Sequence, residues 1–243
     1  MKQRKRISVL NVPIDPLTMQ ESVDFLHERL EKQERSFVVT ANAEIIMMCQ
    51  SDADYQSIVA HTADLVLPDG AGTVWAGRKL GFEVPERVAG FDLFNQLLHL
   101  AAEQQYKVFF FGGSPGIAEA AASKAQALYP GVNIVGCRNG YFAEDESQAI
   151  IKEINESGAQ LLFLALGAPK QEKWYARYAE QIDSSLAMGI GGSFDVLAGK
   201  MARAPLWMQK ASLEWFFRLY KQPSRLGRMM VLPQFVIRVL CNK

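Results

Sequence analysis

The sequence predicts an α/β fold of the Rossmann-like type, in which a mostly parallel sheet is flanked by helices. Across residues 107–195, short apolar runs alternate with amphipathic segments, which is typical of a parallel sheet covered on both faces. Several of these runs end in glycine or polar residues, as strands do where they enter a loop. The composition agrees, because 243 residues that are 49% hydrophobic and 21% charged suffice for a large core.

Run length and periodicity predict the individual elements. In the second half of this unit, strands are expected at 108–111, 132–135, 161–166 and 186–190. Amphipathic segments between them predict helices at 116–128, 144–156 and 170–181. In the first half we expect strands at 37–40 and 65–67, with a shorter strand or hairpin arm at 7–12. Helices are expected there at 18–32, 43–50, 53–61 and 91–104.

These elements divide the chain into a core at 1–199 and a C-terminal appendage at 200–243. The core has an N-terminal half, about 1–105, and a second half, about 106–199, whose glycine-rich turn at Gly112 and Gly113 leads us to expect that this half binds a nucleotide. The appendage contains four aromatic residues in six positions from Trp215 to Tyr220, too many for one narrow core stripe. It is also interrupted by Pro223 and Pro233. We therefore predict helical, amphipathic segments that dock on a partner or lie in a membrane interface.

The charge is unevenly distributed. The 26 basic residues balance the 26 acidic ones, so the net charge does not favour a nucleic-acid partner. Residues 201–243, however, carry eight basic residues against Glu214 alone, a local charge of +7 that suits an anionic membrane surface. The apolar runs are shorter than the roughly 18 residues that span a bilayer, and the start of the chain lacks a signal-peptide core. Three scattered cysteines suit a reducing compartment, so we expect a cytoplasmic protein. With the basic appendage, this places the expected protein on the inner face of the cell membrane.

Ligands of open parallel sheets bind at the carboxyl ends of the strands, so the residues that follow each strand are candidates. Asp69 follows an apolar strand and precedes Gly70; it would act as a general base if it reached a substrate hydroxyl, or else it caps a helix or occupies a turn. Asn42, with Thr40 before it, has the same alternatives of helix cap and substrate ligand. Gln171 stands at a helix start after a buried strand, where polar groups either hold a sugar or phosphate or belong to an ordinary junction.

The glycine-rich turn that begins at Gly112 and Gly113 is a candidate phosphate site, since free backbone N–H groups face a ligand there. The alternative is an ordinary strand-to-helix turn. A Walker loop is excluded because no Gly-Lys-Ser/Thr follows, and a dinucleotide fingerprint is disfavoured by the spacing and by the absence of an acidic residue after strand 132–135. A mononucleotide or a nucleotide sugar fits this turn better than NAD does.

The sequence offers little support for a metal site. Asp52 and Asp54 form a DxD pair, but they lie between two predicted helices, where Asp52 is better interpreted as an N-cap. We therefore expect no metal and no cofactor. Cations are the alternative partners for a diphosphate: Arg87 precedes a predicted helix, and Arg218, Arg225 and Arg228 recur on roughly one helical face of the appendage.

Together these segments resemble the WecG/TagA/CpsF family of glycosyltransferases over nearly the whole chain. Motifs in the family's order carry the resemblance: Thr40-Ala-Asn42-Ala-Glu44, Leu67-Pro-Asp69-Gly70, Arg87-Val-Ala-Gly90-Phe-Asp92, Phe111-Gly-Gly113, Asn139-Gly-Tyr141, Ala165-Leu-Gly167-Ala-Pro169-Lys-Gln171-Glu172-Lys173, Gly189-Ile-Gly-Gly-Ser-Phe-Asp195, Arg203-Ala-Pro205 and Glu214-Trp-Phe-Phe-Arg218-Leu. The chain is most similar to the TagA branch. That branch transfers N-acetylmannosamine from UDP-N-acetylmannosamine to the 4-hydroxyl of N-acetylglucosamine on undecaprenyl diphosphate, a step of wall teichoic acid synthesis.

The resemblance also implies roles for residues. Asp69 would be the general base of an inverting, metal-independent transfer, and Thr40, Asn42, Arg87 and Gln171 would position the sugars and the diphosphate. Gly112, Gly113, Tyr141 and Asp195 would lie near the UDP. The appendage, with Arg218, Arg225 and Arg228, would close over the site at the membrane.

Three alternatives remain open from the sequence. Other branches of the family use other donors, such as UDP-N-acetylmannosaminuronic acid. A non-catalytic nucleotide-binding module with a membrane-associated tail is a second interpretation, and a Rossmann-type oxidoreductase a third. The exposed aromatics at 215–217 suit a second subunit as well as a bilayer, so a homo-oligomer is also open.

Overall fold

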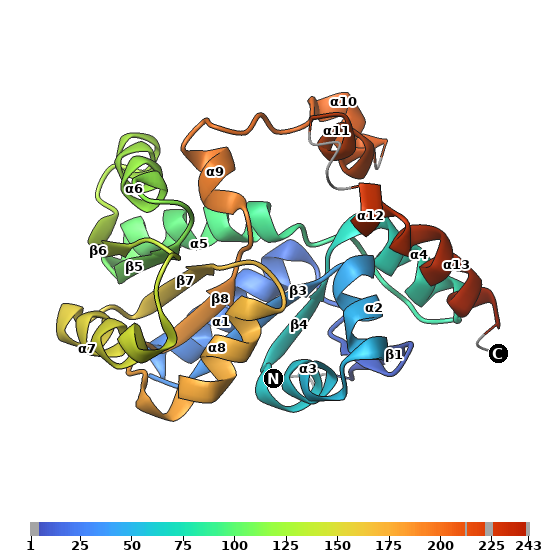
Figure 1. Ribbon diagram of the computed structural model, residues 1–243, viewed down its shortest axis with the longest axis horizontal. Coiled ribbons are helices and arrows are strands. Elements are labelled where there is room, and N and C mark those ends of the chain that lie inside the picture. The colour runs from blue at the N-terminus through green and yellow to red at the C-terminus, as the bar shows by residue number, and fades with distance from the viewer. Residues whose placement is uncertain (1–4, 212, 222–225, 242–243) are drawn as a thin grey trace.

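The computed structural model describes residues 5–211, 213–221 and 226–241, and it confirms the predicted α/β class. Six parallel strands form one sheet in the order β4-β3-β8-β7-β5-β6 (Figure 1). Their bounds are β3 Ser36–Ala41, β4 Leu65–Pro68, β5 Lys107–Gly112, β6 Asn133–Arg138, β7 Leu161–Ala165 and β8 Leu186–Gly189. The predicted arm at 7–12 is part of a separate antiparallel hairpin, β1 Ile7–Val9 and β2 Val12–Ile14.

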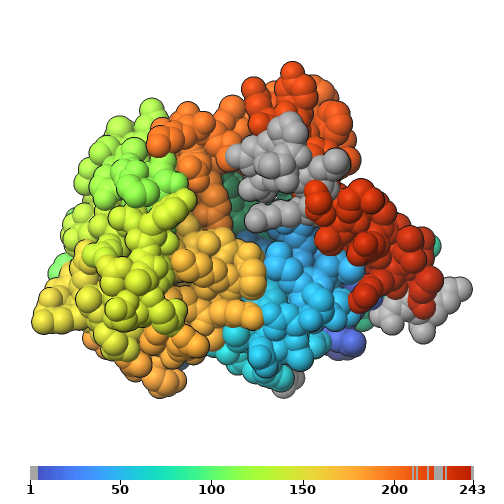
Figure 2. Space-filling model, in the orientation of Figure 1, coloured from blue at the N-terminus to red at the C-terminus, as the bar shows by residue number. Residues whose placement is uncertain are grey.

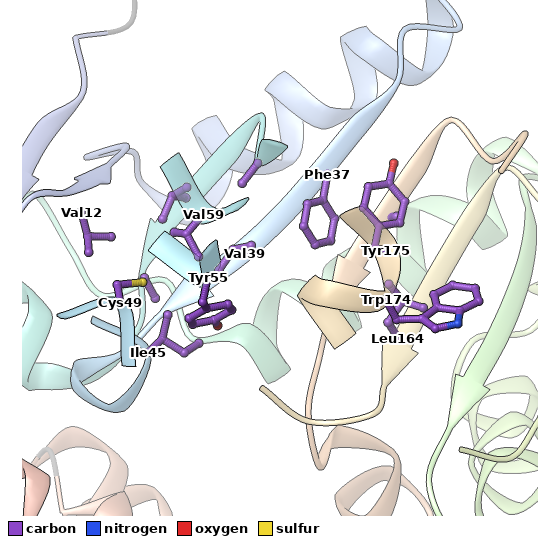
Figure 3. Packing of buried hydrophobic residues seen from close by; sticks show 14 of the residues in the cluster. Val12, Phe37, Val39, Ile45, Cys49, Tyr55, Val59, Leu164, Trp174 and Tyr175 are labelled. Carbon is purple, nitrogen blue, oxygen red and sulfur yellow. The ribbon is translucent and has the colours of Figure 1, made fainter. Parts of the chain in front are cut away.

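Helices cover both faces of the sheet. On one face lie α1 Met19–Glu31, α5 Gly90–Gln104, α6 Ile117–Leu128 and α9 Ser193–Leu197. On the other lie α2 Ala43–Ser51, α3 Ala53–Ser57, α7 Ser147–Ser157 and α8 Lys170–Tyr178. Side chains of each central strand alternate between the two faces: Phe37 and Val39 of β3 enter one core, whereas Val38 enters the other. Figure 3 shows part of the first core, where Phe37 stacks on Tyr175 at a ring distance of 4.1 Å.

Two helices were not predicted, and one of them starts at the candidate base. Helix α4, Gly70–Lys79, contains three glycines, which lower helix propensity. Tertiary packing explains one of them, because a Cβ on Gly77 would lie 2.6 Å from the Val84 side chain. Close packing against Val84 therefore requires a small residue at position 77. The sequence of the helix alone does not show this contact. The sequence did not predict α9 because its five residues are too few to show a helical periodicity.

The end of the chain is part of the folded body. After α10 Leu206–Lys210, α11 Glu214–Lys221 and α12 Leu226–Met229, helix α13 Val231–Cys241 packs on α2 and α4 (Figure 1). Its Phe235 and Val239 are 1% and 2% exposed and belong to the first core. Within the described residues, no helix combines the length and apolarity that a bilayer crossing needs.

Replacing Phe235 with alanine is expected to lower the free energy of unfolding by about 3–5 kcal/mol, since a buried phenyl ring leaves a cavity that α2 and α4 cannot refill. Ile237 on the same helix is 60% exposed, so Ile237→Ala is the matched control and should change stability little. Urea denaturation of both variants measures the difference. An equal, small effect would show that α13 is not part of the core.

Candidate active site

The carboxyl ends of four strands surround a polar cavity of about 180 Å³. Thr40 is the penultimate residue of β3, Asp69 follows β4, and the loops after β7 and β8 complete the wall. Figure 2 shows the molecule hollowed on this face, between the yellow and orange residues of α8 and α9 and the blue residues of α2. The described lining residues are Thr40, Asn42, Glu44, Ile45, Met48, Asp69, Gly90, Phe91, Gly167, Ala168, Gln171, Gly189, Ile190, Gly191, Gly192 and Ser193.

Asp69 occupies the N-cap position of α4, one of the two structural alternatives, but its side chain makes no capping bond to that helix. The half-buried carboxylate lines the cavity instead. Its backbone N–H donates to the Ala41 carbonyl at 3.1 Å, and the Gly90 N–H donates to Asp69 Oδ2 at 3.4 Å. The start of α5 therefore contacts the carboxylate where it lines the cavity.

Thr40 and Asn42 lie in the same cavity as Asp69. Asn42 serves as the cap that was one of its alternatives, since its Oδ1 accepts from the Ile45 N–H at 3.0 Å. Thr40 lies against Gly90, where a Cβ would approach the Thr40 hydroxyl oxygen to 2.6 Å. A glycine at position 90 thus allows α5 to start close enough to hold Asp69.

Gln171 is 4% exposed and joins the two loops of the cavity. Its Oε1 accepts from the backbone N–H groups of Gly167 and Gly191, both at 3.1 Å. Its Nε2 donates to Glu172 Oε1 at 2.8 Å. The residue therefore holds the loop after β7 to the loop after β8 while it lines the cavity.

A second cavity of about 470 Å³ lies at the ends of β5, β6 and β7. Gly113, Tyr141, Lys170 and Asp195 line it, and the loop between β7 and α8 contributes to both cavities, so the two adjoin. Gly112 is buried beneath, at φ +133°, where a Cβ would lie 2.4 Å from the Ala165 backbone. Gly112 thus serves packing against β7, while Gly113 faces the cavity.

The structure places Arg87 outside the Asp69 cavity, in a neighbouring hollow between α4 and α10. There Arg87 Nη1 lies 2.6 Å from Glu214 Oε2 of α11. Glu214 also meets Arg203 at 3.5 Å, and Arg203 forms a bidentate pair with Asp92 of α5 at 2.5 and 2.8 Å. This four-residue ion-pair network attaches the appendage to the edge of the site. Sequence reasoning missed it because the partners are up to 127 positions apart.

Two other groups of candidates have different outcomes. Asp52 does cap α3, accepting from the Tyr55 N–H at 2.9 Å, and its second oxygen pairs with Lys173 at 2.5 Å.

The proposed diphosphate arginines remain predictions: Arg225 lies outside the described residues, as do the side chains of Arg218 and Arg228.

These features define a Rossmann-like enzyme with a carboxylate and a candidate nucleotide pocket at the carboxyl edge of a parallel sheet. The sequence matches the model of the glycosyl transferase WecG/TagA/CpsF family over residues 7–243, and the chain belongs to that family.

Among similar proteins is the N-acetylglucosaminyldiphosphoundecaprenol N-acetyl-beta-D-mannosaminyltransferase of Bacillus subtilis, 32% identical over 96% of this chain and 90% of the relative. The protein of the same name from Bacillus spizizenii is 35% identical over 87% of this chain and 81% of its own length. That of Staphylococcus aureus strain MW2 is 30% identical over 96% and 92%.

Proposed function

We propose that this chain transfers N-acetylmannosamine from UDP-N-acetylmannosamine to the 4-hydroxyl of N-acetylglucosamine on undecaprenyl diphosphate, completing the β-1,4 linkage disaccharide of wall teichoic acid. The observation that carries the proposal is that Asp69, Thr40, Asn42 and Gln171 come from three separate segments of the chain and meet in one polar cavity. Relatives at 30–35% identity bear the name of this activity.

Asp69 is the general base of the proposed reaction. It accepts the proton of the acceptor hydroxyl, whose oxygen forms a bond to C1 of the donor sugar. The bond between C1 and the β-phosphate oxygen breaks, UDP leaves with the electron pair, and the configuration at C1 inverts. Thr40, Asn42 and Gln171 hold the sugars in line for this displacement.

The adjoining cavity is the proposed UDP pocket. Tyr141 is 73% exposed and offers a ring for stacking on the base. The ammonium of Lys170, which lies 4.4 Å from the centre of the Phe142 ring, is placed to meet a phosphate, and Asp195 can accept from ribose hydroxyls. Gly113 lets the donor approach the backbone.

The proposed transfer uses no resident metal or cofactor. Both oxygens of Asp52 are engaged, one by the cap of α3 and one by Lys173, so the first acid of the DxD pair has a structural role. Charge on the departing UDP falls to Lys170 and to backbone N–H groups, and Arg87 with the tail residues Arg218, Arg225 and Arg228 would neutralise the acceptor diphosphate.

Product analysis tests the proposed function. The protein is incubated with a short-chain lipid-diphosphate N-acetylglucosamine and, separately, UDP-N-acetylmannosamine, its uronate analogue and UDP-glucose. We expect disaccharide product and UDP release with the first donor. Product with the uronate alone would assign the chain to another surface polysaccharide, and UDP binding without product from any donor would make it a non-catalytic module.

We also propose that the appendage holds the protein on the inner face of the cell membrane. Helices α10 and α11 expose Trp207, Phe216 and Tyr220 by 64%, 51% and 73%. Aromatic side chains beside basic residues are typical of an interfacial helix that binds an anionic bilayer from one side.

Replacing Trp207 and Phe216 together with serine should weaken binding to anionic phospholipid vesicles by about a hundredfold or more, because each ring contributes roughly 1.5–3 kcal/mol when buried in lipid. Leu128 on α6 is 52% exposed and lies outside the appendage, so Leu128→Ser is the matched control. Vesicle sedimentation measures both. Truncation at 200 is a poor substitute, because it would remove the buried Phe235 and Val239. Equal binding by the double variant and the wild type would refute the membrane role.

A further inference from the structure

Glu172 is a buried acid beneath the Asp69 cavity that has no part in the proposed reaction. It lies in the first turn of α8 and is 1% exposed. It forms no ion pair with any residue in the described part of the chain. Carboxyl groups are rarely buried without a counter-ion unless their environment uses them, so this residue requires an explanation.

The hydrogen bonds of Gln171 explain why a carboxyl group is buried at position 172. A carboxamide presents an acceptor at one end and donors at the other, and Gln171 Oε1 faces two backbone donors, the N–H groups of Gly167 and Gly191. The opposite end then needs an acceptor, which Glu172 Oε1 provides at 2.8 Å from Gln171 Nε2. An apolar residue at position 172 would leave the buried amide group without this partner.

Strand β8 shows that the chain makes room for this pair of side chains. A Cβ added to Gly189 would lie 2.4 Å from Gln171 Nε2 and 3.1 Å from Glu172 Oε1. Position 189 therefore admits only glycine while both side chains keep this arrangement. This steric observation is independent of the hydrogen bonds and points to the same arrangement.

Glu172 fits this role in its neutral form. Burial raises the pKa of Glu172, and the hydrogen bond that Gln171 Nε2 donates to it opposes this effect only in part. Cys49 and Asp52, the other titratable groups that act on Tyr55, bring no positive charge, and the nearby ammonium of Lys173 pairs with Asp52 at 2.5 Å. Figure 3 shows Tyr55 and Cys49 packed among apolar side chains of the first core. A neutral carboxyl can accept from Gln171 without a counter-ion.

We propose that Glu172 is a positioning residue, which orients the Gln171 carboxamide and through it holds the loops after β7 and β8 in the shape that binds substrate. Its effect on turnover rests on the proposed function. Its effect on the loops does not, because the hydrogen bonds involved lie within the protein.

Two substitutions test the role of Glu172. Glu172→Gln keeps the size and the acceptor oxygen, so it should retain kcat/KM within about twofold, whereas Glu172→Leu should lower it by about tenfold or more because a buried amide loses its partner. Adding Glu172→Leu to Gln171→Ala should cause no further loss, since Glu172 acts through Gln171. Tyr55→Phe, which leaves Glu172 Oε1 in place, is the control and should remain active.

Hydrogen exchange supplies a readout that needs no substrate. In Glu172→Leu the amides of Gly167 and Gly191 should exchange about tenfold faster than in the wild type, and in Glu172→Gln at the wild-type rate. Should Glu172→Leu not fold, the comparison of Glu172→Gln with the wild type still decides. A folded Glu172→Gln that loses activity or protection overturns the proposal. Absence of transfer by the wild type from every donor would instead refute the proposed function, and the exchange result would still stand.

Discussion

Replacing Asp69 with asparagine is expected to reduce the rate of UDP release by about 10²- to 10⁴-fold, the usual contribution of a general base. Asparagine has the same shape and can still accept from the Gly90 N–H, so the carboxylate is the only function lost. The rate is measured at saturating donor and acceptor. Thermal unfolding and donor binding should match the wild type, because asparagine keeps the size of the side chain and the bond from the Gly90 N–H.

Glu44 is the appropriate comparison for this result. Among the described residues that line the cavity, only Asp69 and Glu44 carry carboxylates. If Asp69 is the base, Glu44→Gln should cause a loss much smaller than that of Asp69→Asn. A larger loss in Glu44→Gln would move the base to α2, and near wild-type turnover in both variants would remove carboxylate base catalysis from this cavity.

Replacing Arg87 with alanine is expected to lower kcat/KM by about 10²- to 10³-fold, comparable with the loss of one strong electrostatic contact to the transition state. The proposed reason is that Arg87 leaves Glu214 and pairs with the diphosphate of the acceptor, which carries more negative charge. Arg87→Lys should recover part of the loss, because a lysine supplies the charge without the bidentate geometry.

The alternative is that Arg87 only anchors the appendage, and Glu214→Gln separates the two roles. If Arg87 acts on the diphosphate, Glu214→Gln should retain activity or increase it, because it removes a competitor at 2.6 Å. If Arg87 is only an anchor, Glu214→Gln should lose at least as much activity as Arg87→Ala, because it breaks the pair with Arg87 and also the contact with Arg203. Steady-state kinetics with acceptor varied at saturating donor measures the difference, and a stable fold is confirmed by thermal unfolding.

Predictions for the strands and for most helices were confirmed because their signals are local. A strand that is buried on both faces is apolar along most of its length, and this pattern is present in β3, β5 and β7. The positions of Asp69, Thr40 and Asn42 followed in turn, because the carboxyl ends of parallel strands meet at one edge. Their sharing of one cavity could thus be expected before any coordinates were known.

Other features depend on contacts between distant parts of the chain. Helix α4 contains Gly77 because the Val84 side chain leaves no room there for a larger residue. This contact between distant residues explains a glycine that, in the sequence alone, argues against a helix. The sequence predicted that the appendage docks on a partner or lies in a membrane interface, but it did not identify α2 and α4 as the surface that buries Phe235. A hydrophobic pattern tells that a face is buried but not what covers it.

The sequence by itself determined the α/β class and the edge of the sheet at which the candidate polar residues gather, since both depend on periodicity and chain order. Only the tertiary structure decided which partners the polar groups take. Gln171 was expected to hold substrate, and it also joins two loops through its amide; Arg87 was expected beside Asp69 but pairs with Glu214. Hydrogen bonds and ion pairs depend on distances of about 3 Å between groups far apart in the chain, and only the folded arrangement sets those distances.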